Sequence, residues 1–87
     1  MTSPTESDIQ KKISRYVLDN FPTTYDATTL PQDTSLLELG ILDSYGVIEL
    51  VEYLEKEWDI TILENEITTE KMGSIIKMAR LVMSKAR

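Results

Sequence analysis

The chain has 87 residues, enough for one small domain, and it contains neither cysteine nor histidine. Disulfides, thiolate nucleophiles, imidazole bases and the usual zinc ligands are therefore excluded. Fifteen acidic residues against nine basic ones give a net charge of −6, which argues against a nucleic-acid partner.

The acidic charge is concentrated in the middle of the chain. Residues 38–70 contain ten acids and a single base, Lys56, whereas the remaining residues contain five acids and eight bases. The middle segment thus has a balance of −9 and the rest a balance of +3. Such a charge distribution attracts basic partner surfaces and speeds their encounter.

The sequence gives no sign of membrane insertion or export. No apolar run approaches the length of a membrane span, and residues 1–8 lack the basic and apolar regions of a signal peptide. We therefore expect a cytoplasmic monomer. Residues 1–7 are polar and lack periodicity, so we predict a disordered tail there and a single domain over residues 8–87.

A first helix is predicted from about Ser7 or Asp8, either of which can serve as its cap. Its apolar stripe consists of Ile9, Ile13, Tyr16 and Val17. The helix should end at Asn20, because the residue before Pro22 avoids helical geometry. A long connection, residues 22–35, follows, and a short turn after it should present three leucines inward, namely Leu36, Leu37 and Leu39.

The central helix is predicted over residues 44–57, where apolar residues recur at helical spacing. Its buried stripe consists of Val47, Leu50, Val51, Leu54 and Trp58, and its opposite face carries Glu49, Glu52, Glu55 and Glu57. Residues 60–62 form an extended connector, and a short helix near residues 64–68 places Ile67 inward. A last helix begins at Thr69 or at Gly73-Ser74. The expected fold is all-α, a small bundle of three longer helices and one short one with a long first loop.

Ser44 stands at the start of the central helix, where serine is a preferred N-cap and Asp43 suits the positive helix end. Two features of the neighbouring residues suggest that Ser44 is more than a helix cap. Gly46 lies in the first turn, where glycine costs about 0.5–1 kcal/mol relative to alanine. Tyr45 and Ile48 are apolar residues that do not fit the core stripe, and an exposed apolar pair among glutamates is typical of a docking patch.

The sequence is poorly equipped for catalysis. The glutamates of the central helix lie opposite its apolar stripe, so we interpret them as a solvated face rather than as an acid–base pair or a metal site. Ser44 lacks a base, because histidine is absent and Lys56 is three turns away. The Asp-rich loop spacing of a calcium-binding EF-hand is also missing. We therefore expect neither an enzyme nor a bound metal.

The segment Asp33-Thr34-Ser35-Leu36, followed by Leu39-Gly40-Ile41-Leu42-Asp43-Ser44, an acidic amphipathic helix and Ile60-Thr61-Ile62, resembles the acyl carrier proteins. The resemblance runs from about Ile9 to Val82 and includes the helix order, the long first loop and the short third helix. It implies that a phosphopantetheinyl transferase attaches 4′-phosphopantetheine from coenzyme A to Ser44. The thiol of this arm would carry an acyl or aminoacyl group as a thioester, which would account for a carrier without cysteine.

The same resemblance assigns roles to the residues around Ser44. Asp43 would help to recognise the modifying enzyme. Partner enzymes with basic docking surfaces, which load and transfer the cargo, would contact Tyr45, Ile48, Glu49, Glu52 and Glu55. An acyl chain would be sheltered among Leu50, Leu54, Ile62, Ile67 and Ile75.

One departure from the family pattern indicates which carriers this chain resembles most. Carriers of fatty-acid synthesis usually have leucine and then a polar residue after the serine, where this chain has Tyr45-Gly46. The segment is more similar to the D-alanyl carriers and to free-standing carriers of specialised pathways. The cargo is left open between a fatty-acid-like, a polyketide and an aminoacyl group. The alternative from another class is an unmodified helical adaptor that docks basic partners, with Ser44 a simple cap.

Overall fold

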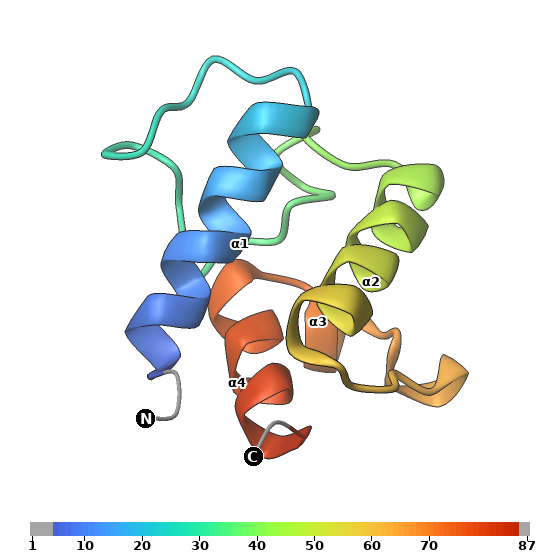
Figure 1. The fold of residues 1–87 in the computed structure, drawn as a ribbon. Helices are drawn as coiled ribbons and strands as arrows, with labels where there is room; N and C mark the ends of the chain where they lie inside the picture. Colours follow the sequence, from blue (N-terminus) through green and yellow to red (C-terminus); the bar gives the residue numbers. More distant parts are fainter. Residues whose placement is uncertain (1–4, 86–87) are drawn as a thin grey trace.

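The computed structural model describes residues 5–85, which form four α-helices and one 3-10 helix, with no strand among them (Figure 1). The elements in chain order are α1 (Glu6–Asn20), α2 (Ser44–Trp58), η1 (Glu64–Glu66), α3 (Thr69–Met72) and α4 (Ile75–Lys85). The predicted all-α bundle with three longer helices and one short one is confirmed. No helix in the described part of the chain is long and apolar enough to cross a membrane.

Helix α1 begins earlier than predicted, because Thr5 rather than Ser7 or Asp8 is its N-cap. The Thr5 hydroxyl accepts the Asp8 N–H at 3.1 Å, and the Asp8 carboxylate accepts the Thr5 N–H at 3.4 Å. This reciprocal capping box satisfies two backbone donors that would otherwise have no partner. The end of the predicted tail 1–7 therefore belongs to the helix, and its first part, residues 1–4, lies outside the described residues.

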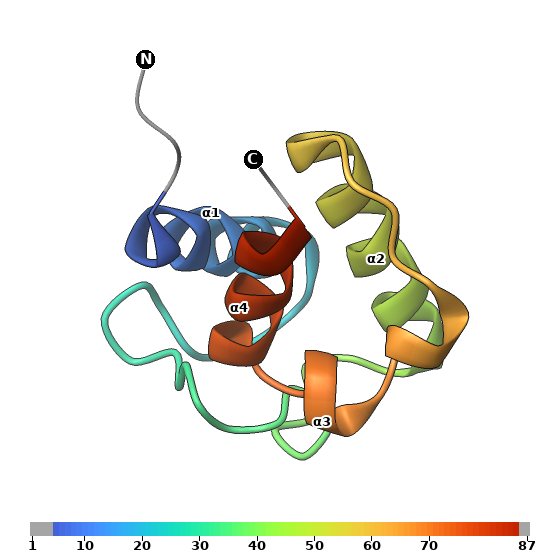
Figure 2. The same ribbon diagram turned by 90° about the horizontal axis from the view of Figure 1, so that it is seen from below.

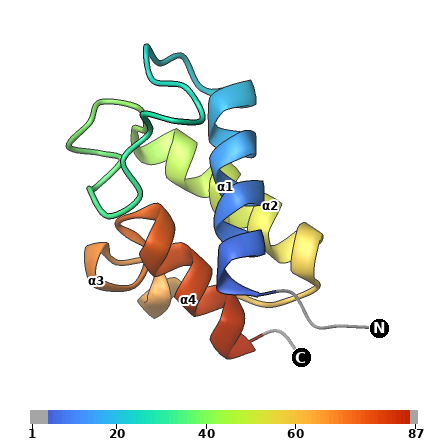
Figure 3. The ribbon, with the colours of Figure 1, turned by 90° about the vertical axis from the view of Figure 1, so that its left-hand side faces the viewer.

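Helix α4 is the central element of the bundle. It runs beside α1, and seen from below it lies between α1 and α2 (Figure 2). Figure 3 shows α2 passing behind α1 at an angle. The apolar stripes of the three long helices meet between them and exclude water, which supplies most of the stabilisation. The buried helix residues are Ile9, Ile13, Val17, Leu50, Val51, Leu54, Ile75, Met78, Ala79, Leu81 and Val82.

The long connection between α1 and α2 is held against the start of α4. The Ile76 N–H donates to the Gln32 carbonyl at 2.9 Å, and the Leu36 N–H donates to the Gly73 carbonyl at 3.1 Å. Leu36 is buried as predicted and Leu39 is half-buried. Leu37 was expected to point inward, but half of it is exposed (50%), because a tight turn cannot direct adjacent side chains to the same side.

The segment after α2 also differs in detail from the expectation. The connector 60–62 has no secondary structure, as predicted, but the single short helix expected near residues 64–68 is replaced by η1 and α3. Ser74 begins the last helix, since its hydroxyl accepts the Lys77 N–H at 3.2 Å. The Lys85 Nζ, at the end of α4, forms an ion pair with the Glu66 Oε1 of η1 at 2.7 Å. This pair links η1 to α4.

Candidate functional site

The N-terminus of α2 is capped by Asp43 and not by Ser44. Asp43 has extended backbone geometry, and its Oδ1 accepts the Gly46 N–H at 2.8 Å. Its carbonyl accepts the Val47 N–H at 3.0 Å, which is the first intrahelical bond. The carboxylate also suits the positive end of the helix. The interpretation of Ser44 as the cap is therefore wrong by one residue.

Ser44 is consequently the first residue of α2 rather than its cap. Its side chain is exposed, and its hydroxyl forms no hydrogen bond with any described residue. At this end of α2 the free backbone N–H of Gly46 is accepted by the side chain of Asp43 and not by that of Ser44. The Ser44 hydroxyl is thus accessible and not committed to holding the fold.

Gly46 lies where the start of α2 packs against Leu42 and against Phe21, the residue that follows α1. It is buried, and a Cβ at this position would lie 3.0 Å from Leu42 Cδ2 and 3.2 Å from Phe21 Cε1. Both distances are shorter than ordinary van der Waals contact. A side chain at this position would therefore require Leu42 or Phe21 to shift, so the packing here favours the glycine that is costly for an isolated helix.

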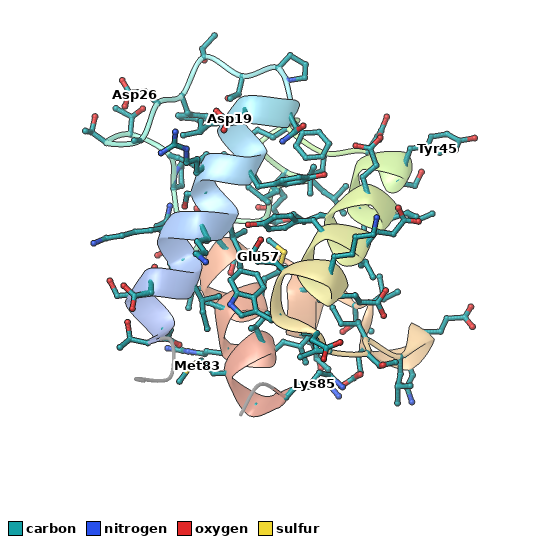
Figure 4. All side chains as sticks on the ribbon, in the orientation of Figure 1. Asp19, Asp26, Tyr45, Glu57, Met83 and Lys85 are labelled. Atoms are coloured by element: carbon teal, nitrogen blue, oxygen red, sulfur yellow. The ribbon has the colours of Figure 1, made fainter. Side chains whose placement is uncertain are left out.

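Two exposed apolar side chains, Tyr45 and Ile48, lie near Ser44 on α2. Tyr45 is 80% exposed and Ile48 is 56% exposed, so both face solvent, as their misfit with the core stripe predicted. Figure 4 shows Tyr45 projecting away from the bundle at the start of α2. Two leucines elsewhere in the chain are also exposed: Leu37, which was predicted to point inward, and Leu63, for which the sequence made no prediction. The signal available for both was only their location in segments without helical periodicity.

The glutamates of α2 fall into two groups. Glu49 and Glu52 are exposed, and neither forms a hydrogen bond or an ion pair with a described residue. Glu55 is half-buried, and its Oε2 accepts the Ile62 N–H at 2.9 Å. Glu57 pairs with Lys12 of α1 at 3.1 Å. The expectation that all four form one solvated face is thus wrong for Glu55, which holds the connector after α2.

The predicted acyl pocket is mostly solid core. Leu50, Leu54, Ile62 and Ile75 are buried among other side chains, and of the five predicted residues only Ile67 lines the small apolar cavity beside α2. This cavity has a volume of about 110 Å³, well below the ~300 Å³ of typical ligand pockets. It lies between the turn before α2, the start of α2 and α3, and it is lined by Leu36, Leu37, Leu42, Val47, Ile67, Thr68, Thr69, Met72 and Gly73.

Aromatic side chains join α2 to α1. The rings of Tyr16 and Tyr53 are stacked, with centroids 3.9 Å apart and planes 14° apart. Burial, together with the nearby charges of Glu57 and Tyr16, raises the pKa of Tyr53 to about 12. Burial likewise raises the pKa of Tyr16, with Glu49 and Glu52 contributing. No group of three or more metal-ligating side chains occurs within the described residues.

No family model matches the chain, and none of the curated proteins matches it. A solved structure described as a crystal structure of a FAD-dependent dehydrogenase contains a chain that is 32% identical to this one, with a TM-score of 0.62. The similarity covers 83% of this chain and 94% of that chain, so the matched chain is about as short as this one. At this identity and coverage, the two chains belong to one family.

Proposed function

We propose that this chain is a carrier protein that bears 4′-phosphopantetheine on Ser44 and presents an acyl or aminoacyl thioester to partner enzymes. The observation that carries the proposal is the accessible Ser44 hydroxyl at the start of a 15-residue helix whose cap is supplied by Asp43. The motif from Gly40 to Ser44 and the acidic middle of the chain agree with it.

The residues around Ser44 fit the phosphodiester of such an arm. The N-terminus of α2 presents backbone N–H groups and the positive end of the helix dipole, and both favour a bound phosphate. The arm itself would supply a thiol, which this cysteine-free chain lacks. The chain also lacks histidine, and the Asp43 carboxylate beside Ser44 already accepts the Gly46 N–H, so we assign the base that takes the Ser44 hydroxyl proton to the transferase. This chain would position the cargo, and its partners would perform the chemistry.

Incubation of the protein with coenzyme A and a broad-specificity phosphopantetheinyl transferase tests the proposal. We expect the intact mass to increase by one phosphopantetheine. A control carrier in the same tube establishes that the transferase is active. If the control is converted and this chain is not, the carrier function is contradicted, and the adaptor function, in which the acidic helix docks a basic partner without modification, takes its place.

The proposed docking surface consists of Tyr45, Ile48, Glu49 and Glu52. Its apolar pair is exposed and its two carboxylates have no partner among the described residues, so all four side chains are available. Glu55 is left out, because its carboxylate already holds the Ile62 N–H. Basic residues on the partner would be steered by the charges and would dock on the apolar pair.

Ile48→Glu tests this surface, with Met83→Glu as its matched control. Met83 is also exposed and apolar, but it lies on α4, far from Tyr45 (Figure 4). We expect Ile48→Glu to lower kcat/KM of the transferase about tenfold, the loss expected for one well-placed apolar contact. Met83→Glu should leave kcat/KM unchanged. Equal kinetics for the two variants would place the docking surface elsewhere.

We further propose that a FAD-dependent dehydrogenase is among the partners. The support is the solved structure described by that activity, which contains a related chain about as short as this one. Such a partner would remove two hydrogens from the carried group, and its flavin would accept the electrons. Mixing that dehydrogenase with this chain loaded with different acyl and aminoacyl groups should bleach the flavin absorbance for the right cargo. Absence of bleaching with every cargo would contradict this partner alone.

A further inference from the structure

A groove runs between α1 and the long connection that follows it. It has a volume of about 680 Å³, and it is lined by side chains of α1 between positions 7 and 19 and of the connection between positions 27 and 32. Tyr16, which stacks on α2, lies on the opposite face of α1. Figure 4 shows Asp26 of the connection and Tyr45 of α2 on opposite sides of α1. The groove is therefore separate from the proposed docking surface.

Hydrogen bonds hold the connection in place as one wall of the groove. The Asp26 carboxylate accepts the N–H groups and the hydroxyls of Thr28 and Thr29 at distances from 2.7 to 3.2 Å. The Ser14 hydroxyl of α1 donates to the Gln32 Oε1 at 3.2 Å, which joins α1 to the connection. A preformed surface of this kind costs little conformational entropy to bind against.

Two cations lie one helical turn apart along the groove. Lys11 and Arg15 are exposed, and Lys11 forms no ion pair within the described residues. Arg15 pairs with Asp19 at 3.7 Å, and so exposed a pair is weak. Asp19 is the only acid among the described residues that line the groove. The groove therefore attracts an anionic partner, whereas the acidic face of α2 attracts a basic one.

The spacing of the two cations matches an extended peptide. Four residues of an α-helix rise about 6 Å, and side chains on one face of an extended strand recur every ~6.6 Å. Acids at alternate positions of a strand lying along α1 would therefore meet Lys11 and Arg15 together. The side chain between the two acids would face the connection, where Ala27 and Leu30 offer apolar contact.

We propose that this groove binds an extended segment of a partner protein that carries acidic residues at alternate positions. From position 7 to position 18 the axis of α1 rises about 16 Å, which accommodates about five extended residues. The inference goes beyond the proposed function, because it concerns a second surface and requires neither Ser44 nor its modification. A protein held here would leave the surface around Tyr45 free for an enzyme.

Three five-residue peptides, each acetylated and amidated, test the proposal by amide chemical-shift titration at low salt, where exposed charges interact most strongly. Leu-Glu-Val-Glu-Leu has acids at alternate positions, Glu-Glu-Leu-Val-Leu has the same composition in another order, and Leu-Gln-Val-Gln-Leu has no acid. We expect the first peptide to bind about two- to fivefold more tightly than the second, the gain from one additional exposed ion pair, and the third to bind most weakly. Equal affinities of the first two peptides, or shifts centred on α2, would overturn the proposal.

Charge-matched variants give the result its specificity. Lys11→Gln combined with Arg15→Gln should abolish the preference for the alternating peptide. Lys56→Gln combined with Lys71→Gln, which removes the same charge outside the groove, should retain it. Retention of the preference by the first double variant would contradict the proposed site. Spectra of the protein alone at two concentrations test for a second copy as the occupant: shifts that centre on the groove as the concentration rises would overturn the proposal in favour of self-association.

Discussion

The N-terminal part of α2, residues 44–52, and its C-terminal part, residues 53–58, each contain two glutamates, but these glutamates differ in their contacts. In the N-terminal part, the side chains of Ser44, Glu49 and Glu52 are exposed and form no hydrogen bond with a described residue. In the C-terminal part, the Glu55 carboxylate accepts the Ile62 N–H and Glu57 pairs with Lys12. The difference arises because the connector after α2 and Lys12 of α1 lie beside the carboxylates of the C-terminal part. Helical periodicity places a carboxylate on a face, but the neighbouring segments decide whether it is free to meet a partner.

The largest expected effect on stability comes from Glu55→Ala. It removes a charged acceptor from the half-buried Ile62 N–H, and hydrogen bonds to charged groups contribute about 1.5–3 kcal/mol. We expect the free energy of unfolding, measured by urea denaturation, to fall by about that amount. Glu52→Ala is the matched control and should change it by less than ~0.5 kcal/mol. Equal effects of the two substitutions would contradict the distinction between the N-terminal and C-terminal parts of α2.

Asp43→Ala should have the next largest effect. It deletes the N-cap of α2 and leaves the Gly46 N–H without its acceptor, which typically costs about 1 kcal/mol. Circular dichroism during urea denaturation gives the free energy of unfolding. Asp33→Ala, an exposed aspartate in the long connection, serves as the control and should leave stability nearly unchanged. An unaltered stability of Asp43→Ala would mean that another side chain caps the helix.

Titration of Tyr53 probes the C-terminal part of α2 through its contact with Tyr16 of α1. Its pKa is raised in the folded protein from 10.0 to about 12, chiefly by burial. Above pH 10 the unfolded chain therefore releases this proton while the folded chain retains it, and stability falls as the pH rises toward 12. Phenolate absorbance should show a transition near pH 12 that Tyr53→Phe removes and Tyr45→Phe leaves in place. Its persistence in Tyr53→Phe would contradict the packing of Tyr53 against Tyr16.

Local sequence signals were sufficient for much of the fold. The apolar stripe of α2 gave its position to within a residue, and the misfit of Tyr45 and Ile48 with that stripe gave their exposure. The cap of α2 was misplaced by one residue because aspartate and serine are both good caps and stand side by side. Only the geometry of the chain entering the helix decides between Asp43 and Ser44.

The remaining features depend on contacts between distant segments, which no local pattern encodes. The role of Glu55 requires knowing that the chain turns back so that Ile62 lies beside it. The place of the small cavity depends on α3, whose short sequence has little periodicity to reveal it. The close packing around Gly46 likewise depends on the approach of Phe21, 25 positions earlier in the sequence.

The central claim is that the Ser44 hydroxyl is the attachment site and does not stabilise the fold. Ser44→Ala tests it most directly, with modification and stability measured on one sample. We predict no mass increase with coenzyme A and transferase, and a free energy of unfolding within ~0.5 kcal/mol of wild type, as for surface substitutions generally. Continued modification of Ser44→Ala would contradict the assignment of the attachment site. A loss of about 1 kcal/mol, the cost of a deleted cap, would show that Ser44 holds the helix after all.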